Sequence, residues 1–171
     1  MIQTLDLFPQ SIGCLHYEGD LSLYIKKIYE IQSQVNNFVV NFPKELQYQT
    51  PPDLFDKYSE FNFIKNFIEE LISNYYNKTL KICNSWANIY SKFGYTPYHT
   101  HLPYPVSGVL YLTTPPNDFL KIHNKNSSSE AKNILVKSGD ILFFSGDQPH
   151  STYPNLSNYD KIIIAFNLVK A

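Results

Sequence analysis

The stretch KIIIAFNLV at residues 161–169 decides the fold that this sequence predicts. Its middle is apolar at consecutive positions, so an extended segment here would be hydrophobic on both faces. A strand of this kind is covered on both sides. We therefore predict the central strand of a sheet, with other elements packed above and below it.

Working outward, short strands precede this stretch from residue 80 onward. Turn residues separate them at near-regular spacing, and no helical segment lies between them. This pattern favours an antiparallel sandwich or barrel over a parallel sheet with crossover helices, and a double-sheet jelly-roll is its closed form. The expected strands before the central one cover residues 80–83 running on to 86–90, then 106–113, 119–122, 134–136, 141–144 and 150–153.

Two amphipathic helices are expected before the strands. Apolar residues recur with a period of 3.6 over residues 21–31, with Asp20 as N-cap, and again over residues 59–76, with Ser59 as N-cap. Residues 36–56 contain three prolines and are expected to form a loop that borders the substrate entrance.

The sequence thus predicts a mainly β fold with N-terminal helices, a cupin-like jelly-roll padded by two helices. A length of 171 residues suits one domain. Within it, we expect residues 1–78 to be a helical support region and residues 79–171 to be the jelly-roll core.

Composition excludes several classes of protein. The formal net charge is −1, so a nucleic-acid partner is not expected. No stretch approaches ~18 uninterrupted apolar residues, and the first residues do not resemble a signal peptide. We therefore expect no membrane association and a cytoplasmic location. Cys14 and Cys83 form neither a disulfide framework nor a CxxC motif.

The chemistry is expected at Tyr98-His99-Thr100-His101 and at His150. In an extended segment, residues i and i+2 point to the same face, so His99 and His101 could meet one metal ion. A jelly-roll makes neighbours of distant strands, which allows His150 to complete a three-point site. Imidazole binds Fe, Zn and Cu alike, so these residues alone leave the metal open.

Further short motifs surround these histidines in a specific order. They are Trp86-x-Asn88, His99-x-His101, SGVLYL at 107–112, SGDILFF at 138–144, Pro149-His150 and KIIIAFN at 161–167.

This order resembles that of the iron(II)- and 2-oxoglutarate-dependent oxygenases, and more closely a small branch of that family found in bacteria and phages. The resemblance covers about residues 80–169 and implies a double-stranded β-helix, which is a jelly-roll. The family motif HxD/E…H maps onto His99, His101 and His150, which implies that they bind Fe(II). Lys161 matches the cation that pairs with the far carboxylate of 2-oxoglutarate. The other implied contacts of 2-oxoglutarate are Tyr111, Asn88, Tyr90 and Thr152.

His101 stands where the family has a carboxylate. A neutral imidazole leaves an Fe(II) site one negative charge short, which should change its affinity and redox behaviour. Three interpretations stay open: a working three-histidine iron site, iron held by two histidines and a water, or a degenerate site. We expect Trp86 to be a core aromatic residue rather than a substrate contact.

The implied function is a non-heme Fe(II)- and 2-oxoglutarate-dependent oxygenase that uses O2 to hydroxylate a small-molecule or peptide substrate. One alternative is a cupin-like three-histidine dioxygenase or isomerase that does not use 2-oxoglutarate. Another is a non-catalytic jelly-roll binding module with a vestigial metal site. We expect the substrate to be recognised by the proline-bearing loop at 43–52 and the polar loop at 124–129.

Overall fold

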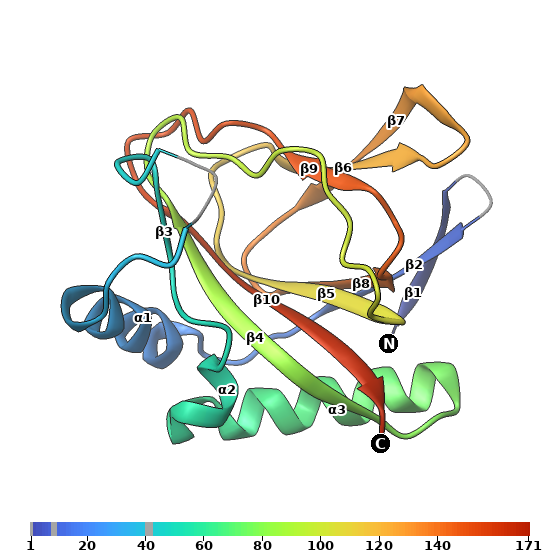
Figure 1. Cartoon of the computed structure of the whole chain (residues 1–171), viewed down its shortest axis with the longest axis horizontal. Helices are drawn as coiled ribbons and strands as arrows, with labels where there is room; N and C mark the ends of the chain where they lie inside the picture. The colour runs from blue at the N-terminus through green and yellow to red at the C-terminus, as the bar shows by residue number, and fades with distance from the viewer. Residues whose placement is uncertain (1, 8–9, 40–42) are drawn as a thin grey trace.

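In the computed structural model, two antiparallel β-sheets face each other (Figure 1). The structure describes residues 2–7, 10–39 and 43–171, and within these ranges one sheet has seven strands and the other has three. The strands are β1 (Gln3–Leu7), β2 (Gln10–His16), β3 (Gln47–Gln49), β4 (Leu80–Tyr90), β5 (Val106–Thr113), β6 (Asp118–Asn124), β7 (Ser127–Val136), β8 (Asp140–Ser145), β9 (His150–Thr152) and β10 (Lys161–Lys170).

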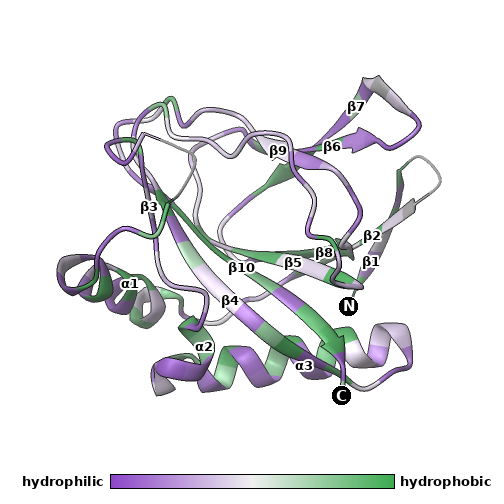
Figure 2. Cartoon of the chain, in the orientation of Figure 1, coloured by the Kyte–Doolittle hydropathy of each residue, from purple (hydrophilic) through white to green (hydrophobic). Residues whose placement is uncertain are grey.

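The larger sheet has the order β1-β2-β8-β5-β10-β4-β3, and the smaller sheet has the order β7-β6-β9. β10 lies between β5 and β4 and is buried at every position from Lys161 to Leu168. Figure 2 shows β10 coloured hydrophobic over most of its length. The central strand predicted at residues 161–169 is thereby confirmed.

Helices cover the face of the larger sheet that points away from the smaller one (Figure 1). They are α1 (Ser22–Gln34), α2 (Leu54–Lys57) and α3 (Asn62–Tyr76), with a 3-10 turn at Ser59–Phe61. Apolar helix residues such as Ile28 and Ile68 share one buried cluster with Phe143 and Phe166 of the sheet. Each such fully buried side chain contributes about 1.5–3 kcal/mol of hydrophobic stabilisation. A second cluster, which includes Val109, fills the space between the two sheets.

The helix boundaries differ in part from the predicted ones. The N-cap position of the first helix is Leu21 rather than the predicted Asp20, although the Asp20 carboxylate accepts a 2.9 Å hydrogen bond from the backbone N–H of Ser22. The N-cap predicted at Ser59 is wrong: that residue begins the 3-10 turn, and α3 starts at Asn62 without a side-chain cap. The four-residue helix α2 was not predicted, since it is too short to show a helical period.

The extended stretch predicted at 80–83 and running on to 86–90 is one continuous strand, β4, as expected. Two other expected segments change. The polar loop predicted at 124–129 is a tight turn at residues 125–126, because β7 already begins at Ser127. The loop predicted at 36–56 contains β3 and α2.

The N-terminal 78 residues also contribute strands to the larger sheet. β1 and β2 extend one edge of this sheet, and β3 forms the other. Within the described part of the chain, none of the helices is long and apolar enough to cross a membrane.

Candidate metal centre and its cavity

The main chain brings the three histidines of the predicted site together. His99 and His101 lie on the irregular segment between β4 and β5, and His150 begins β9. His99 and His150 form an antiparallel bridge, in which each backbone N–H donates to the carbonyl of the other at 3.1 Å. The N–H of His101 donates to the carbonyl of Gly146 at 2.7 Å. The backbone therefore holds all three residues in place.

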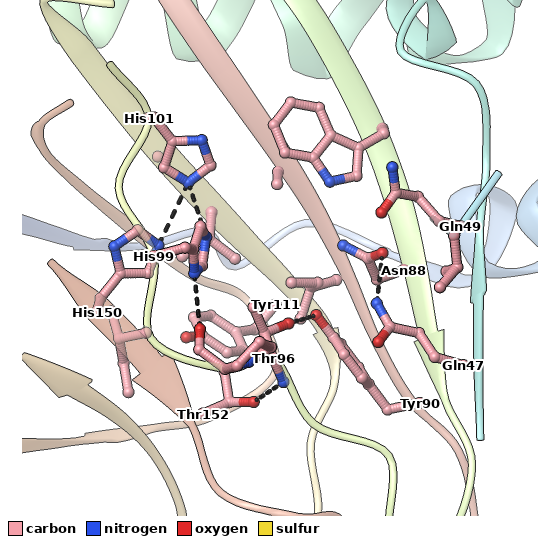
Figure 3. Close-up of a pocket in the computed structure, with 18 of the residues that line it drawn as sticks. Gln47, Gln49, Asn88, Tyr90, Thr96, His99, His101, Tyr111, His150 and Thr152 are labelled. Atoms are coloured by element: carbon pink, nitrogen blue, oxygen red, sulfur yellow. Dashed lines mark hydrogen bonds between the residues drawn. The ribbon is translucent and has the colours of Figure 1, made fainter. Parts of the chain in front are cut away.

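The three imidazole rings converge, and each of them points its Nε2 atom toward the other two. Nε2 of His101 lies 3.2 Å from Nε2 of His99 and 3.3 Å from Nε2 of His150 (Figure 3). One ligand atom of each histidine lies within 4.8 Å of the other two. Three nitrogen atoms at this spacing can all contact one ion.

Hydrogen bonds on the far side of the rings fix which nitrogen is available. Nδ1 of His99 is 2.9 Å from the carbonyl oxygen of Pro97, and Nδ1 of His150 is 2.9 Å from that of Gln148. A carbonyl can only accept, so both Nδ1 atoms carry the proton and both Nε2 atoms present lone pairs. Nε2 of His101 could donate a proton to the lone pair of one neighbouring Nε2 atom but not to both. A cation bound between the rings would relieve the repulsion between the lone pairs that still face each other.

Burial keeps the three imidazoles neutral. It lowers the pKa of His101 to about 3, and the nearby His99 adds to this because two adjacent imidazoles would repel each other if both were protonated. Burial also lowers the pKa of His150 well below its usual value and lowers that of His99. Neutral imidazole is the form that binds metal, so the site is prepared for a cation.

The donor set fits a divalent transition metal. Imidazole suits Fe, Zn and Cu, and His99 and His150 have the oriented outer hydrogen bonds that metal-binding histidines usually make. Among the residues that the structure describes, the cluster of possible metal ligands contains these three histidines and no carboxylate. Three protein ligands would leave other positions of a bound ion open for exchangeable ligands.

A cavity of about 400 Å³ contains this centre. Small-molecule sites have volumes of this order. None of the described residues that line it is Asp, Glu, Lys or Arg. One part of the wall is apolar, with Val109, Leu120, Phe144 and Ile163, and another carries amide and hydroxyl groups.

Four of the five predicted 2-oxoglutarate contacts line the cavity: Asn88, Tyr90, Tyr111 and Thr152. Two of these are joined through Thr96. The Tyr90 hydroxyl is 2.7 Å from the Thr96 hydroxyl, and the Thr96 N–H donates to Oγ1 of Thr152 at 2.8 Å (Figure 3). The Tyr111 hydroxyl differs from these, because it is buried and has no hydrogen-bond partner among the residues that the structure describes.

The fifth predicted contact, Lys161, lies beside the cavity rather than among the residues that line it. Its Nζ is 2.6 Å from Oδ2 of Asp118, and the two side chains are only 1% and 5% exposed. The ammonium also lies 5.7 Å from the ring centre of Tyr90 and 5.5 Å from that of Tyr111. Burial lowers the pKa of Lys161, while the charge of Asp118 opposes this.

The structure adds residues that the sequence did not single out. Gln47 and Gln49 of β3 line the cavity, but a Gln-Tyr-Gln alternation over three residues is too short to stand out as a strand. Nothing near Asp118 in the sequence pointed to Lys161. The prediction for Trp86 is wrong: this residue lines the cavity, with its ring centre 5.8 Å from that of His101.

Comparisons with known proteins agree with this site. A family model described as "Putative 2OG-Fe(II) oxygenase" matches residues 84–167, a segment that includes all three histidines. A comparison with curated protein sequences found no match.

Several solved structures share the fold over nearly the whole chain. The non-heme alpha ketoglutarate dependent epimerase SnoN from nogalamycin biosynthesis aligns with a TM-score of 0.78 and 10% identity, over 94% of this chain and 78% of its own. HygX from Streptomyces hygroscopicus, with nickel and 2-oxoglutarate bound, has a TM-score of 0.69 and 13% identity, over 94% and 83%. A Pseudomonas putida prolyl-4-hydroxylase has a TM-score of 0.65 and 13% identity, over 91% of both chains. These similarities confirm the predicted double-stranded β-helix.

Proposed function

Since this chain belongs to the 2OG-Fe(II) oxygenase family, we propose that it binds Fe(II) and 2-oxoglutarate in this cavity and hydroxylates a small-molecule or peptide substrate. The observation that carries the proposal is the convergence of three neutral imidazoles, through Nε2, inside a cavity whose wall includes the unpaired Tyr111 hydroxyl. We also propose that residues 1–171 act as one domain, because strands from both parts of the chain share one sheet. The cytoplasmic location stays a prediction.

The chain's own residues have distinct roles in this proposal. His99, His101 and His150 hold the metal and leave open positions for 2-oxoglutarate and O2. When bound, Fe(II) supplies the chemistry in which O2 oxidises 2-oxoglutarate to succinate and CO2 and one oxygen atom enters a substrate C–H bond. The apolar wall with Leu120 and Phe144 limits the access of water.

Two further residues are proposed to bind 2-oxoglutarate. The unpaired Tyr111 hydroxyl can donate to one of its oxygen atoms, which satisfies a group that is otherwise costly to bury. Lys161 has one ion partner, Asp118, while an ammonium can donate three hydrogen bonds. We therefore keep it as the proposed partner of the far carboxylate.

An anaerobic titration tests the proposal. Fe(II) followed by 2-oxoglutarate should produce a metal-to-ligand charge-transfer band, and admission of O2 should yield succinate. His150→Ala should abolish the band. His123→Ala is the matched control, because this histidine bonds to Ser151 and lies outside the cluster, so its band should persist. Fe(II) binding without any band would contradict the use of 2-oxoglutarate.

Tyr111→Phe gives a second test of the cavity. Removing a hydroxyl that has no partner in the described part of the chain should leave the free energy of unfolding unchanged or raise it by up to about 1 kcal/mol. The same change should weaken 2-oxoglutarate binding roughly tenfold, because one hydrogen bond to the ligand is lost. Thermal unfolding and band titration measure the two effects.

The matched control is Tyr90→Phe, which removes a hydroxyl that is already bonded to Thr96. It should lower the free energy of unfolding by about 0.5–1.5 kcal/mol. A stability loss for Tyr111→Phe as large as that for Tyr90→Phe would show that the Tyr111 hydroxyl has a partner within the protein.

A further inference from the structure

Gln47 contacts one of the polar groups in the cavity wall. Its Nε2 donates a 3.0 Å hydrogen bond to Oδ1 of Asn88 (Figure 3). Both side chains are buried, 7% and 5% exposed, and both line the cavity with the histidines. They come from paired strands, β3 and β4, on which Gln49 lies directly opposite Asn88.

This hydrogen bond decides what Asn88 presents to a ligand. A carboxamide has an accepting oxygen at one end and a donating nitrogen at the other. Because Gln47 occupies Oδ1, Nδ2 of Asn88 is the end that remains for a ligand. In Figure 3 this nitrogen points to the side of the cavity where the histidines lie. A donor in that place suits a carboxylate ligand.

The backbone of Gln47 is itself held in place. Nδ2 of Asn37 donates to the carbonyl of Gln47 at 2.7 Å, and Oδ1 of Asn37 accepts from the N–H of Gln49 at 3.0 Å. One side chain therefore holds both ends of the three-residue strand β3. Gln47 cannot easily move away from Asn88.

We propose that Gln47 is a positioning residue for the cosubstrate: it holds Asn88 with Nδ2 toward the cavity, where this group donates to an oxygen atom of 2-oxoglutarate. The inference rests on the proposed function. It assigns to β3, a strand outside the segment that matches the family model, a part in forming the 2-oxoglutarate site.

Two substitutions test the role of Gln47, with 2-oxoglutarate affinity measured from the charge-transfer band of the Fe(II)-loaded full chain. Gln47→Met keeps the volume but removes the donor, and should weaken binding about 3–10-fold. Gln47→Glu introduces an acceptor, so Asn88 turns its Nδ2 away from the cavity, and binding should weaken about 10–100-fold. Thermal unfolding verifies that each variant is folded, and Gln47→Met decides the outcome if the buried carboxylate prevents folding.

The controls separate positioning from general effects. Gln32→Glu adds the same charge at an exposed position of α1 that does not line the cavity, and should change the affinity less than about threefold. In an Asn88→Ala background, Gln47→Met should have no further effect, since the residue through which it acts is gone. Fe(II) affinity should be the same in all of these variants.

Two results would overturn the inference. One is a 2-oxoglutarate affinity in both Gln47 variants that equals that of the wild-type protein. The other is a loss of 2-oxoglutarate affinity from Gln47→Met that is just as large in the Asn88→Ala background. These outcomes presuppose a band in the wild-type protein. If the wild-type protein gives no band, the proposed function itself fails, and the role of Gln47 fails with it.

Discussion

Replacing His101 with alanine is expected to weaken Fe(II) binding by about 100-fold or more, beyond the 10–100-fold typical of losing an outer-shell partner. The reason is geometric: Nε2 of His101 lies 3.2 Å from that of His99 and 3.3 Å from that of His150, so it belongs to the same nitrogen cluster. Anaerobic calorimetry, or competition with a chromophoric chelator, measures the affinity.

His101→Asp is the informative partner of this variant. It supplies the carboxylate that the family motif has at this position, and with it the missing negative charge. We expect it to retain Fe(II) and the 2-oxoglutarate band, with a metal affinity at least equal to that of the wild-type protein. The wild-type residue and aspartate would then be two working solutions at one position.

The pair of variants separates the three interpretations of His101. A three-histidine site predicts a large loss of Fe(II) affinity in His101→Ala. Iron held by two histidines and a water predicts that His101→Ala binds Fe(II) as the wild-type protein does. A degenerate site predicts no Fe(II) binding in the wild-type protein, with binding gained in His101→Asp.

The second large effect concerns the buried ion pair of Asp118 and Lys161. Asp118→Leu leaves an ammonium that is only 1% exposed without its partner, which should lower the free energy of unfolding by about 3–5 kcal/mol. For a chain of this size, the melting temperature should fall by about 6–20 °C. Thermal or urea unfolding, followed by circular dichroism, measures the change.

Two further variants show whether the charge is the cause. Adding Lys161→Met to Asp118→Leu removes both charges, and should recover most of the lost stability. Asp56→Leu breaks an ion pair of the same 2.6 Å length with Lys65, but Asp56 is 60% exposed, so it should cost less than about 1 kcal/mol. Equal losses in the buried and exposed pairs would contradict this account.

Patterns that repeat along the chain made much of the fold predictable. The consecutive isoleucines of β10 identified a strand covered on both faces, and the period of 3.6 located two helices. The alternation of side chains along an extended segment was also enough to place His99 and His101 on one face. Their convergence with His150 followed from the expected jelly-roll, in which distant strands become neighbours.

Features that depend on register between strands were not predictable in the same way. The contact between Asp118 and Lys161 requires the first residue of β6 to face the first residue of β10, which no local pattern encodes. Gln47 meets Asn88 because β3 pairs with the end of β4. Trp86 was misplaced because an aromatic residue in a strand suits a core and a cavity wall equally well.

The backbone bridge between His99 and His150 has a consequence for how the protein opens. These two proposed metal ligands exchange both of their peptide hydrogen bonds, so the segment before β5 cannot separate from β9 unless the three-histidine cluster comes apart with it. If the cluster binds a metal ion as proposed, local opening and metal release form one coupled equilibrium, and a bound ion stabilises the closed arrangement by mass action. Amide hydrogen exchange at His99 and His150 should therefore become slower when metal is bound, so its rate reports metal occupancy as well as folding.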